Sequence, residues 1–228
     1  MKKPLFLICT LLIMTSLGAQ QISVSALGNT DQNLITKANV FTRYDMTSEL
    51  GTGFSFRVSV AQLRVFNWPI GLGLGYHELS SDLQTSGGGL GGGGNRNLTY
   101  QKQLISFAVF PLCFSRNNFH LNFGLAGTRL MNETYEGDVR GWSMGSGDTT
   151  YTIDESFSDV NNEYNFGLNI SAYYNIPLYK GFGISPYLST FVGFSPEVEA
   201  YDLLKGSPLR FFGGLSFYWK FRNRAEAS

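Results

Sequence analysis

Residues 70–76 read Ile-Gly-Leu-Gly-Leu-Gly-Tyr, with an apolar side chain at every second position and glycine between. In a β-strand successive side chains point to opposite faces, so one face of this segment is apolar and the other is almost bare. The same alternation recurs in residues 54–60 and 119–126. These stretches predict an antiparallel sheet with one apolar face and one face of small or polar residues.

The composition excludes several classes of protein. The 228 residues include 27 glycines, 19 phenylalanines and 12 tyrosines, but only 15% are charged, against an ordinary value of about 25%. Seventeen basic and 17 acidic residues give a net charge of zero, which argues against a nucleic-acid-binding protein. The mean hydropathy is −0.05. No run after residue 20 approaches the roughly 18 apolar residues of a membrane-spanning helix.

The first nineteen residues have the pattern of a secretory signal peptide. Lys2 and Lys3 precede an apolar run, and small residues follow it up to Ala19. Cleavage there removes two basic residues and Cys9, so the mature chain has a net charge of −2 and one cysteine, Cys113. We therefore expect an exported protein with no internal disulfide bond.

Eight alternating segments are arranged in up-and-down order, with short and long connections in turn. We predict strands near residues 36–45, 52–66, 70–79, 99–114, 119–131, 161–175, 182–194 and 209–221. The long connections are residues 80–98, 132–160 and 195–208, and they all fall at one end of the sheet. Short periplasmic turns and long external loops are typical of outer-membrane barrels. An even strand count keeps both ends in the periplasm, so residues 20–35 are interpreted as a periplasmic lead-in.

An eight-stranded antiparallel barrel in a membrane satisfies the backbone and fits the strand lengths. In lipid every backbone N–H and C=O must be paired, which a closed sheet achieves. The polar face consists mainly of Gly, Ser, Asn and Thr, whereas a soluble surface carries more Lys, Glu and Asp. Small polar residues suit the narrow interior of an eight-stranded barrel, so we place the apolar face toward lipid. The alternative is a soluble periplasmic barrel with a ligand inside.

Two sets of residues follow from this placement. Aromatic side chains gather near the strand ends, where a membrane barrel carries girdles at the headgroups. The predicted girdle comprises Trp68, Tyr76, Tyr100, Tyr164, Tyr174, Trp219 and Phe221.

Charged and polar residues on the inward face should pair, because an isolated buried charge is costly. The predicted interior polar network comprises Arg57, His120, Glu163, Arg210 and Lys220.

The last strand carries a resemblance to a known family. Residues 215–221, Leu-Ser-Phe-Tyr-Trp-Lys-Phe, resemble the C-terminal assembly signal of Gram-negative outer-membrane proteins. With the leader and the glycine- and aromatic-rich hairpins, the chain resembles a small outer-membrane β-barrel protein of the porin-family type common in Bacteroidota-like bacteria. The resemblance covers about residues 36–221, leaving 222–228 as a tail. It implies outer-membrane lipid and the barrel-assembly machinery, reached through the last strand, as partners.

The sequence offers little for catalysis or cofactor binding. The run Gly87–Gly94 lacks the Lys-Ser/Thr of a phosphate loop and is interpreted as a flexible loop. His77 and His120 have no Cys or carboxylate cluster at metal-ligand spacing, so no metal and no cofactor is expected. A hydrolase would need a histidine with Ser and carboxylate partners. The acidic loop 132–160 supplies such groups, for example Asp154, but nothing links them to either histidine.

We therefore expect a monomeric, non-enzymatic protein of the outer membrane with a structural or interaction role. It would present three long external loops to an unidentified extracellular ligand and would not bind nucleic acid. Eight strands leave no aqueous pore, which disfavours general diffusion. Two alternatives stay open: a narrow channel or transporter for small or hydrophobic molecules, and a lipid- or peptide-hydrolysing enzyme.

Overall fold

The computed structural model describes residues 21–37, 44–65, 68–89, 92–145, 147–155, 163–200 and 204–221. The leader 1–19 and the tail 222–228, both expected from the sequence, lie outside these residues. Strands connected by turns make up the described chain, which contains no helix long and apolar enough to cross a membrane. The expected all-β class is confirmed.

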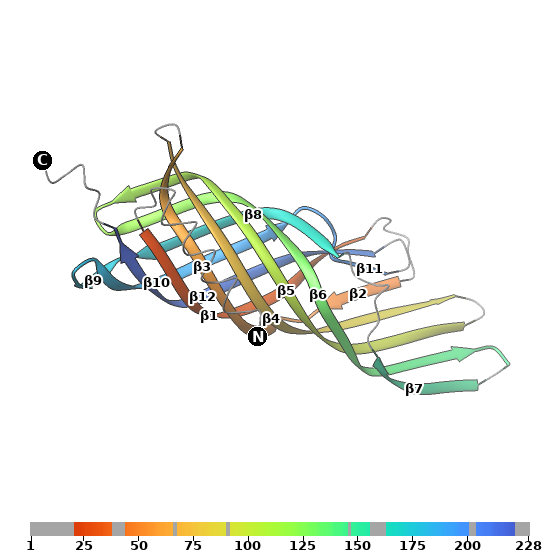
Figure 1. Ribbon diagram of the computed structural model, residues 1–228. Helices are drawn as coiled ribbons and strands as arrows, with labels where there is room; N and C mark the ends of the chain where they lie inside the picture. The colour runs from red at the N-terminus through yellow and green to blue at the C-terminus, as the bar shows by residue number, and fades with distance from the viewer. Residues whose placement is uncertain are drawn as a thin grey trace, which may run out of the picture.

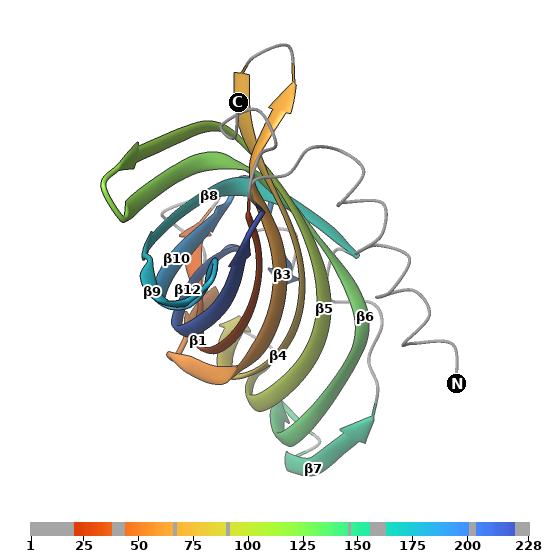
Figure 2. The same ribbon diagram turned by 60° about the vertical axis from the view of Figure 1, so that its left-hand side comes forward.

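Eight strands form a closed antiparallel ring. They are β1 (Gln21–Lys37), β3 (Gly51–Val65), β4 (Trp68–Gly89), β5 (Gly92–Arg116), β6 (Phe119–Ser143), β8 (Tyr164–Tyr174), β10 (Phe182–Gly193) and β12 (Leu204–Lys220). Each strand pairs with the next in this order, and β12 pairs with both β10 and β1, which closes the ring. The predicted eight-stranded up-and-down barrel is thus confirmed. Figure 2 shows the strands curling around a common interior.

The first strand of the ring differs from the prediction. The segment 20–35 was interpreted as a lead-in, yet residues from Gln21 onward form β1, in register with both β12 and β3. Its alternation is weak because Leu27 faces inward while the outward positions include Ala26 and Gly28. Of the predicted first strand 36–45, residues 38–43 lie outside the described part of the chain. The ring still has eight strands, and Gln21 lies opposite Lys220 near the short turns.

Two of the predicted long loops are β-hairpins instead. β4 and β5 stay paired as far as Gly89 and Gly92, so residues 87–89 and 92–94 of the glycine-rich run lie in the paired strands. β6 pairs beyond the ring with β7 (Gly147–Glu155), and β2 (Tyr44–Ser48) pairs with β4. These strands form an extension in the order β2-β4-β5-β6-β7 that projects past one end of the barrel (Figure 1). Cross-strand pairing continues there because the polar residues keep the β alternation.

The remaining strands are short. The third predicted loop, 195–208, contains β11 (Val198–Ala200) and the start of β12, which pair with each other. β9 (Ile176–Tyr179) pairs with β10 at the opposite end of the barrel.

A tight turn at Asn117 and Asn118 joins β5 to β6, and Asn117 has a φ of 55°, which asparagine tolerates better than most residues.

A β-bulge interrupts the alternation of β5 within residues 99–114. Val109 pairs with Leu125 but Leu112 pairs with Phe123, so β5 contains an extra residue at Phe110-Pro111. Proline cannot donate to the ladder and is tolerated at such a bulge. The extra residue exchanges the two faces: Phe110 is buried inside, Leu112 is exposed, and the Cys113 thiol turns inward to donate to the Phe110 carbonyl at 3.4 Å. The Cys113 side chain therefore lies on the interior side of the barrel.

The apolar face of the ring points outward, as predicted. Large exposed hydrophobic side chains occur on every strand of the ring, among them Phe56, Phe107, Leu125, Phe166, Leu188 and Phe217. On the inner face, glycines make room for larger neighbours. A β-carbon on Gly73 would lie 2.8 Å from the Arg57 guanidinium, and one on Gly75 would lie 2.6 Å from the Ser106 hydroxyl. The bare face of residues 70–76 is thus filled by side chains from adjacent strands.

Candidate functional site

Four charged side chains meet inside the barrel and form its most distinctive polar feature. Lys102 Nζ lies 2.6 Å from Asp31 Oδ2 and 2.9 Å from Glu197 Oε2. Arg210 Nε lies 2.8 Å from Asp31 Oδ1, and Arg210 Nη2 also contacts Glu197 Oε1. Two bases and two acids therefore alternate around a closed ring of ion pairs. We call Asp31, Lys102, Glu197 and Arg210 the charge quartet.

The four members come from distant parts of the chain. Asp31 is on β1, Lys102 on β5 and Arg210 on β12, while Glu197 precedes β11. None of the four side chains is more than 4% exposed. Ions removed from water to this degree are retained only when each is paired with good geometry, and loss of one partner leaves an uncompensated charge. The quartet therefore ties β1, β5 and β12 together across the interior.

Aromatic and amide groups surround the quartet. Tyr100, which is fully buried, accepts a hydrogen bond at 2.5 Å from Asn33 Nδ2 and contacts Lys102 Nζ at 3.5 Å. Its ring stacks on that of Tyr135, with the centroids 6.0 Å apart. The Arg210 guanidinium lies over the Phe191 ring at 5.5 Å. These contacts fill the space between the quartet and the barrel wall.

The histidines lie in hydrogen-bonded layers nearer the short turns. His77 bonds to Ser55 and Ser106 through its two ring nitrogens, each at 2.7 Å. His120 bonds to Ser115 at 2.8 Å and Asn175 at 2.9 Å, and its ring stacks on Tyr173. Among the described residues no cluster of His, Cys, Asp or Glu could hold a metal ion. Both imidazole rings are thus held by neutral side chains, as in a packed interior.

Arg57 occupies the level between the two histidines. It donates to the Tyr187 hydroxyl at 2.5 Å, and its guanidinium lies 5.3 Å from the Phe110 ring centroid. Beyond it, Asn175 donates to Gln21 Oε1 at 3.0 Å and accepts from Ser185 at 2.7 Å. Side chains therefore cross the interior at successive levels from Asn175 to Tyr100.

Two small cavities lie among the inward side chains of the described residues. A cavity of about 20 Å³ lies among Ser23, Arg57 and Tyr187, and one of about 10 Å³ lies among His77, Phe191 and Arg210. A single water needs roughly 10–15 Å³ measured in this way. Each of these two cavities among the described inward side chains therefore has room for an isolated water.

The predicted interior network is partly correct. Arg57, His120 and Arg210 are buried in the lumen. The prediction for Glu163 is wrong. Its side chain is exposed on the outer surface, where Oε1 lies 2.8 Å from Arg129 Nη2. Lys220 is exposed at the end of β12, with its Nζ 5.6 Å from the Tyr218 ring. Glu163 precedes the first residue of β8, so the alternation of that strand does not determine which way the Glu163 side chain points.

Three members of the quartet were missed. Asp31 was assigned to the lead-in, and Glu197 to a loop. Lys102 alternates with the inward residues Leu104 and Ala108, so its position on that face was a signal that could have placed it inside. The four side chains meet only because β12 pairs with β1 and closes the ring. Local periodicity in the sequence does not predict that pairing.

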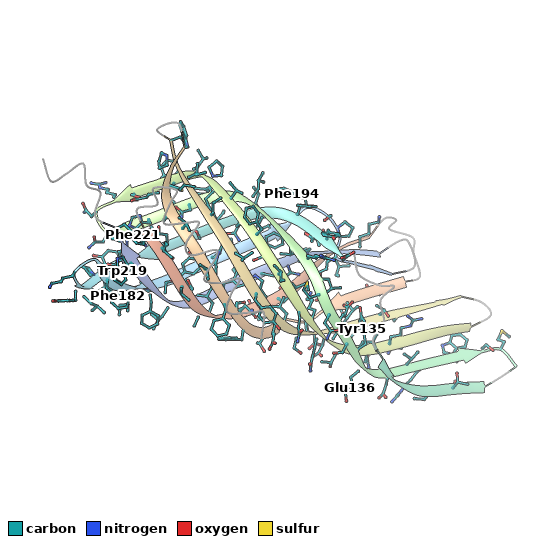
Figure 3. All side chains as sticks on the ribbon, viewed as in Figure 1. Tyr135, Glu136, Phe182, Phe194, Trp219 and Phe221 are labelled. Atoms are coloured by element: carbon teal, nitrogen blue, oxygen red, sulfur yellow. The ribbon has the colours of Figure 1, made fainter. Side chains whose placement is uncertain are left out.

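The predicted girdle is mostly on the outer surface. Trp68, Tyr164, Tyr174 and Trp219 are about half exposed, and Tyr76 and Phe221 are partly exposed. Phe182, Trp219 and Phe221 lie together near the short-turn end of the barrel, whereas Phe194 lies nearer the other end (Figure 3). The girdle prediction is wrong for Tyr100, because its side chain points into the lumen. Its neighbours Thr99 and Gln101 point outward, so the alternation along the strand turns Tyr100 inward.

No protein-family model matches the chain, and no curated protein matches it. Similar solved structures include the outer membrane protein OprG from Pseudomonas aeruginosa, with 9% identity, coverage of 89% of this chain and 97% of that one, and a TM-score of 0.44.

Two further small barrels are similar. Neisserial surface protein A has 11% identity, coverage of 88% and 97%, and a TM-score of 0.39. The outer membrane protein AlkL, solved in DMPC bilayers, has 11% identity, coverage of 90% and 92%, and a TM-score of 0.40. The structural neighbours are thus small outer-membrane β-barrel proteins. With identities and TM-scores this low, nothing about function follows from them.

Proposed function

We propose that the chain is a non-conducting protein of the outer membrane, which anchors an extended extracellular sheet and has no enzymatic activity. The observation that carries this proposal is the filled lumen. The charge quartet and the side-chain layers beneath it leave cavities of about 20 and 10 Å³. A barrel filled in this way supports a structural or interaction role better than the alternative of a narrow channel.

Placement in a membrane is supported by the outer surface of the ring. Leu125, Leu188 and Phe217 are each more than half exposed, as are many apolar side chains around them. Exposed apolar area of this extent is unfavourable in water but suits the hydrocarbon core of a bilayer. A closed ring also satisfies the backbone within lipid. The sequence pattern of residues 1–19 is consistent with export.

The extension beyond the barrel is the part we assign to interaction. Its outward face bears hydroxyl, amide and charged side chains, among them Gln84, Asn97 and Thr99. The hydrogen bond from Thr99 to Asp82, at 2.5 Å, helps to hold this face in one arrangement. An ordered polar sheet outside the membrane is suited to contacts with molecules at the cell surface.

Membrane fractionation and electrical recording test the proposal together. The full chain should be found in the outer-membrane fraction and should migrate differently on SDS gels before and after boiling. Reconstituted into planar bilayers, it should give no stable open current. Recovery in the soluble fraction with no mobility shift would reject the membrane placement. A stable current would favour the channel instead.

A further inference from the structure

A hollow of about 420 Å³ lies on the outer wall of the barrel, where the extension begins. Its floor is the backbone of Gly53, Leu79 and Lys102, which are cross-strand neighbours on β3, β4 and β5. The Leu79 and Lys102 side chains are buried on the interior side. The volume falls within the approximately 300–1,000 Å³ typical of small-molecule sites.

Two cross-strand rows form the sides of this hollow. One row is Phe54, Glu78, Gln103 and Asn132, and the other is Thr52, Ser80, Gln101 and Thr134. All eight line the hollow, and their positions alternate with those of the buried residues. Six of the eight end in a neutral amide or hydroxyl group. The hollow therefore presents many hydrogen-bond donors and acceptors and little charge.

The depth of the hollow relative to the membrane follows from the next row of outward residues. Phe56, Tyr76, Ile105 and Arg129 pair across β3 to β6, and Arg129 pairs with Tyr164 on β8. Aromatic and cationic side chains of this kind mark the boundary between hydrocarbon and headgroups. The hollow is one row farther out, at the level of the lipid headgroups.

The charges around the hollow do not favour an anionic ligand. Glu78 is the charged residue in its two rows, and it accepts a hydrogen bond from the Tyr76 hydroxyl at 2.7 Å. The ammonium group of Lys102 lies on the interior side and is neutralised by Asp31 and Glu197. A phosphate would therefore meet the Glu78 carboxylate, while the cation beneath the hollow, Lys102, is already paired.

We propose that this hollow binds the neutral saccharide headgroup of a glycolipid in the outer leaflet. Sugar hydroxyls both donate and accept hydrogen bonds, which matches the amides of Gln101, Gln103 and Asn132 and the hydroxyls beside them. The exposed ring of Phe54 offers an apolar surface at one end. The inference rests on the membrane placement proposed above and adds a ligand class to it.

Native mass spectrometry of the full chain in an amine-oxide detergent, which carries no sugar, tests the site. The probes are a dihexosyl diacylglycerol, a phosphatidylcholine with the same acyl chains, and the free disaccharide. We expect the glycolipid to bind at least about tenfold more tightly than either, because it alone combines the sugar with a membrane anchor. Equal binding of the two lipids, or free disaccharide binding as tightly as the glycolipid, would overturn the proposal.

A pair of matched double variants locates the site. Gln103 and Asn132 lie directly opposite each other in the hollow, and Gln84 and Asn97 lie directly opposite each other farther out on the extension. Gln103→Leu with Asn132→Leu should weaken glycolipid binding about tenfold, since several hydrogen bonds are lost. Gln84→Leu with Asn97→Leu should leave it unchanged, and equal loss in both would overturn the assignment.

The sign of the charge effect provides a separate check. A phosphorylated glycolipid should bind more weakly than the neutral one, and Glu78→Gln should reduce that difference. A phosphorylated lipid that binds more tightly would contradict the proposal. The boiling-dependent gel shift is measured on every preparation. A folded barrel with no glycolipid preference overturns this inference alone, whereas a chain that remains soluble without detergent overturns the proposed function.

Discussion

Lys102 and Asp31 form a buried ion pair inside the barrel, with 2.6 Å between Nζ and Oδ2. The two side chains are 1% and 0% exposed, and each also contacts the other acid–base pair of the quartet. Removing one partner of a buried ion pair is strongly destabilising, because the other charge stays buried and uncompensated. The quartet should therefore behave as a single unit in which each member needs its partners.

A double-mutant cycle on this pair should show strong coupling. Lys102→Met leaves Asp31 and Glu197 with one base between them, and we expect a loss of about 3–5 kcal/mol in the free energy of unfolding. Combining it with Asp31→Asn should cost less than the sum of the single variants, by about 1–3 kcal/mol. Urea denaturation in detergent, followed by the gel mobility shift, measures each value. Additive effects would show that the charges act independently.

Glu197 and Glu163 provide a direct comparison between a buried and an exposed acid. Glu197→Gln should destabilise the barrel by about 3–5 kcal/mol, because Lys102 and Arg210 would lose a buried partner. Glu163→Gln breaks an exposed pair with Arg129 and should change stability by less than about 1 kcal/mol. The same urea titration checks both variants. A larger loss of stability for Glu163→Gln than for Glu197→Gln would show that Glu163, and not Glu197, belongs to the stabilising ion-pair network.

Gly124 should not tolerate a side chain. A β-carbon there would lie 2.0 Å from the Val109 carbonyl oxygen, beside the bulge at Phe110-Pro111. Gly124→Ala must shift backbone, so we expect a loss of about 1–3 kcal/mol. At Gly28 the nearest atom would be 3.8 Å away, so Gly28→Ala serves as the matched control and should be neutral. Equal thermal midpoints for the two variants would contradict this account of the bulge.

Leu125 tests the lipid-facing surface. It is 59% exposed and lies near the middle of the ring portion of β6, which ends at Phe119 and Arg129. Leu125→Arg should cost about 2–4 kcal/mol in a bilayer, the range for a cation near the midplane of a barrel. Unfolding in phospholipid vesicles, followed by tryptophan fluorescence, measures this cost. Gln84→Arg, on the polar extension, should have little effect, and a similar loss there would argue against a membrane boundary between the two sites.

Much of the barrel could be predicted from local patterns. Alternation in residues 54–60, 70–76 and 119–126 identified strands and their apolar faces, since the β period is set by backbone geometry alone. β1 was missed because Ala26 and Gly28 give it a weak outward face. The hairpin extensions were read as loops because polar composition resembles that of a loop, although pairing continues to Gly89 and Gly92.

The sequence by itself determined the class of fold, the direction of the apolar face and the inward position of Arg57, His120 and Arg210, because each depends on the alternation of neighbouring residues. Only the tertiary structure decided the charge quartet and the hollow beside Gln103. These depend on which strands become neighbours, on bulges that exchange the two faces, and on closure of β12 against β1. Such contacts join residues far apart in the chain, and local periodicity carries no information about them.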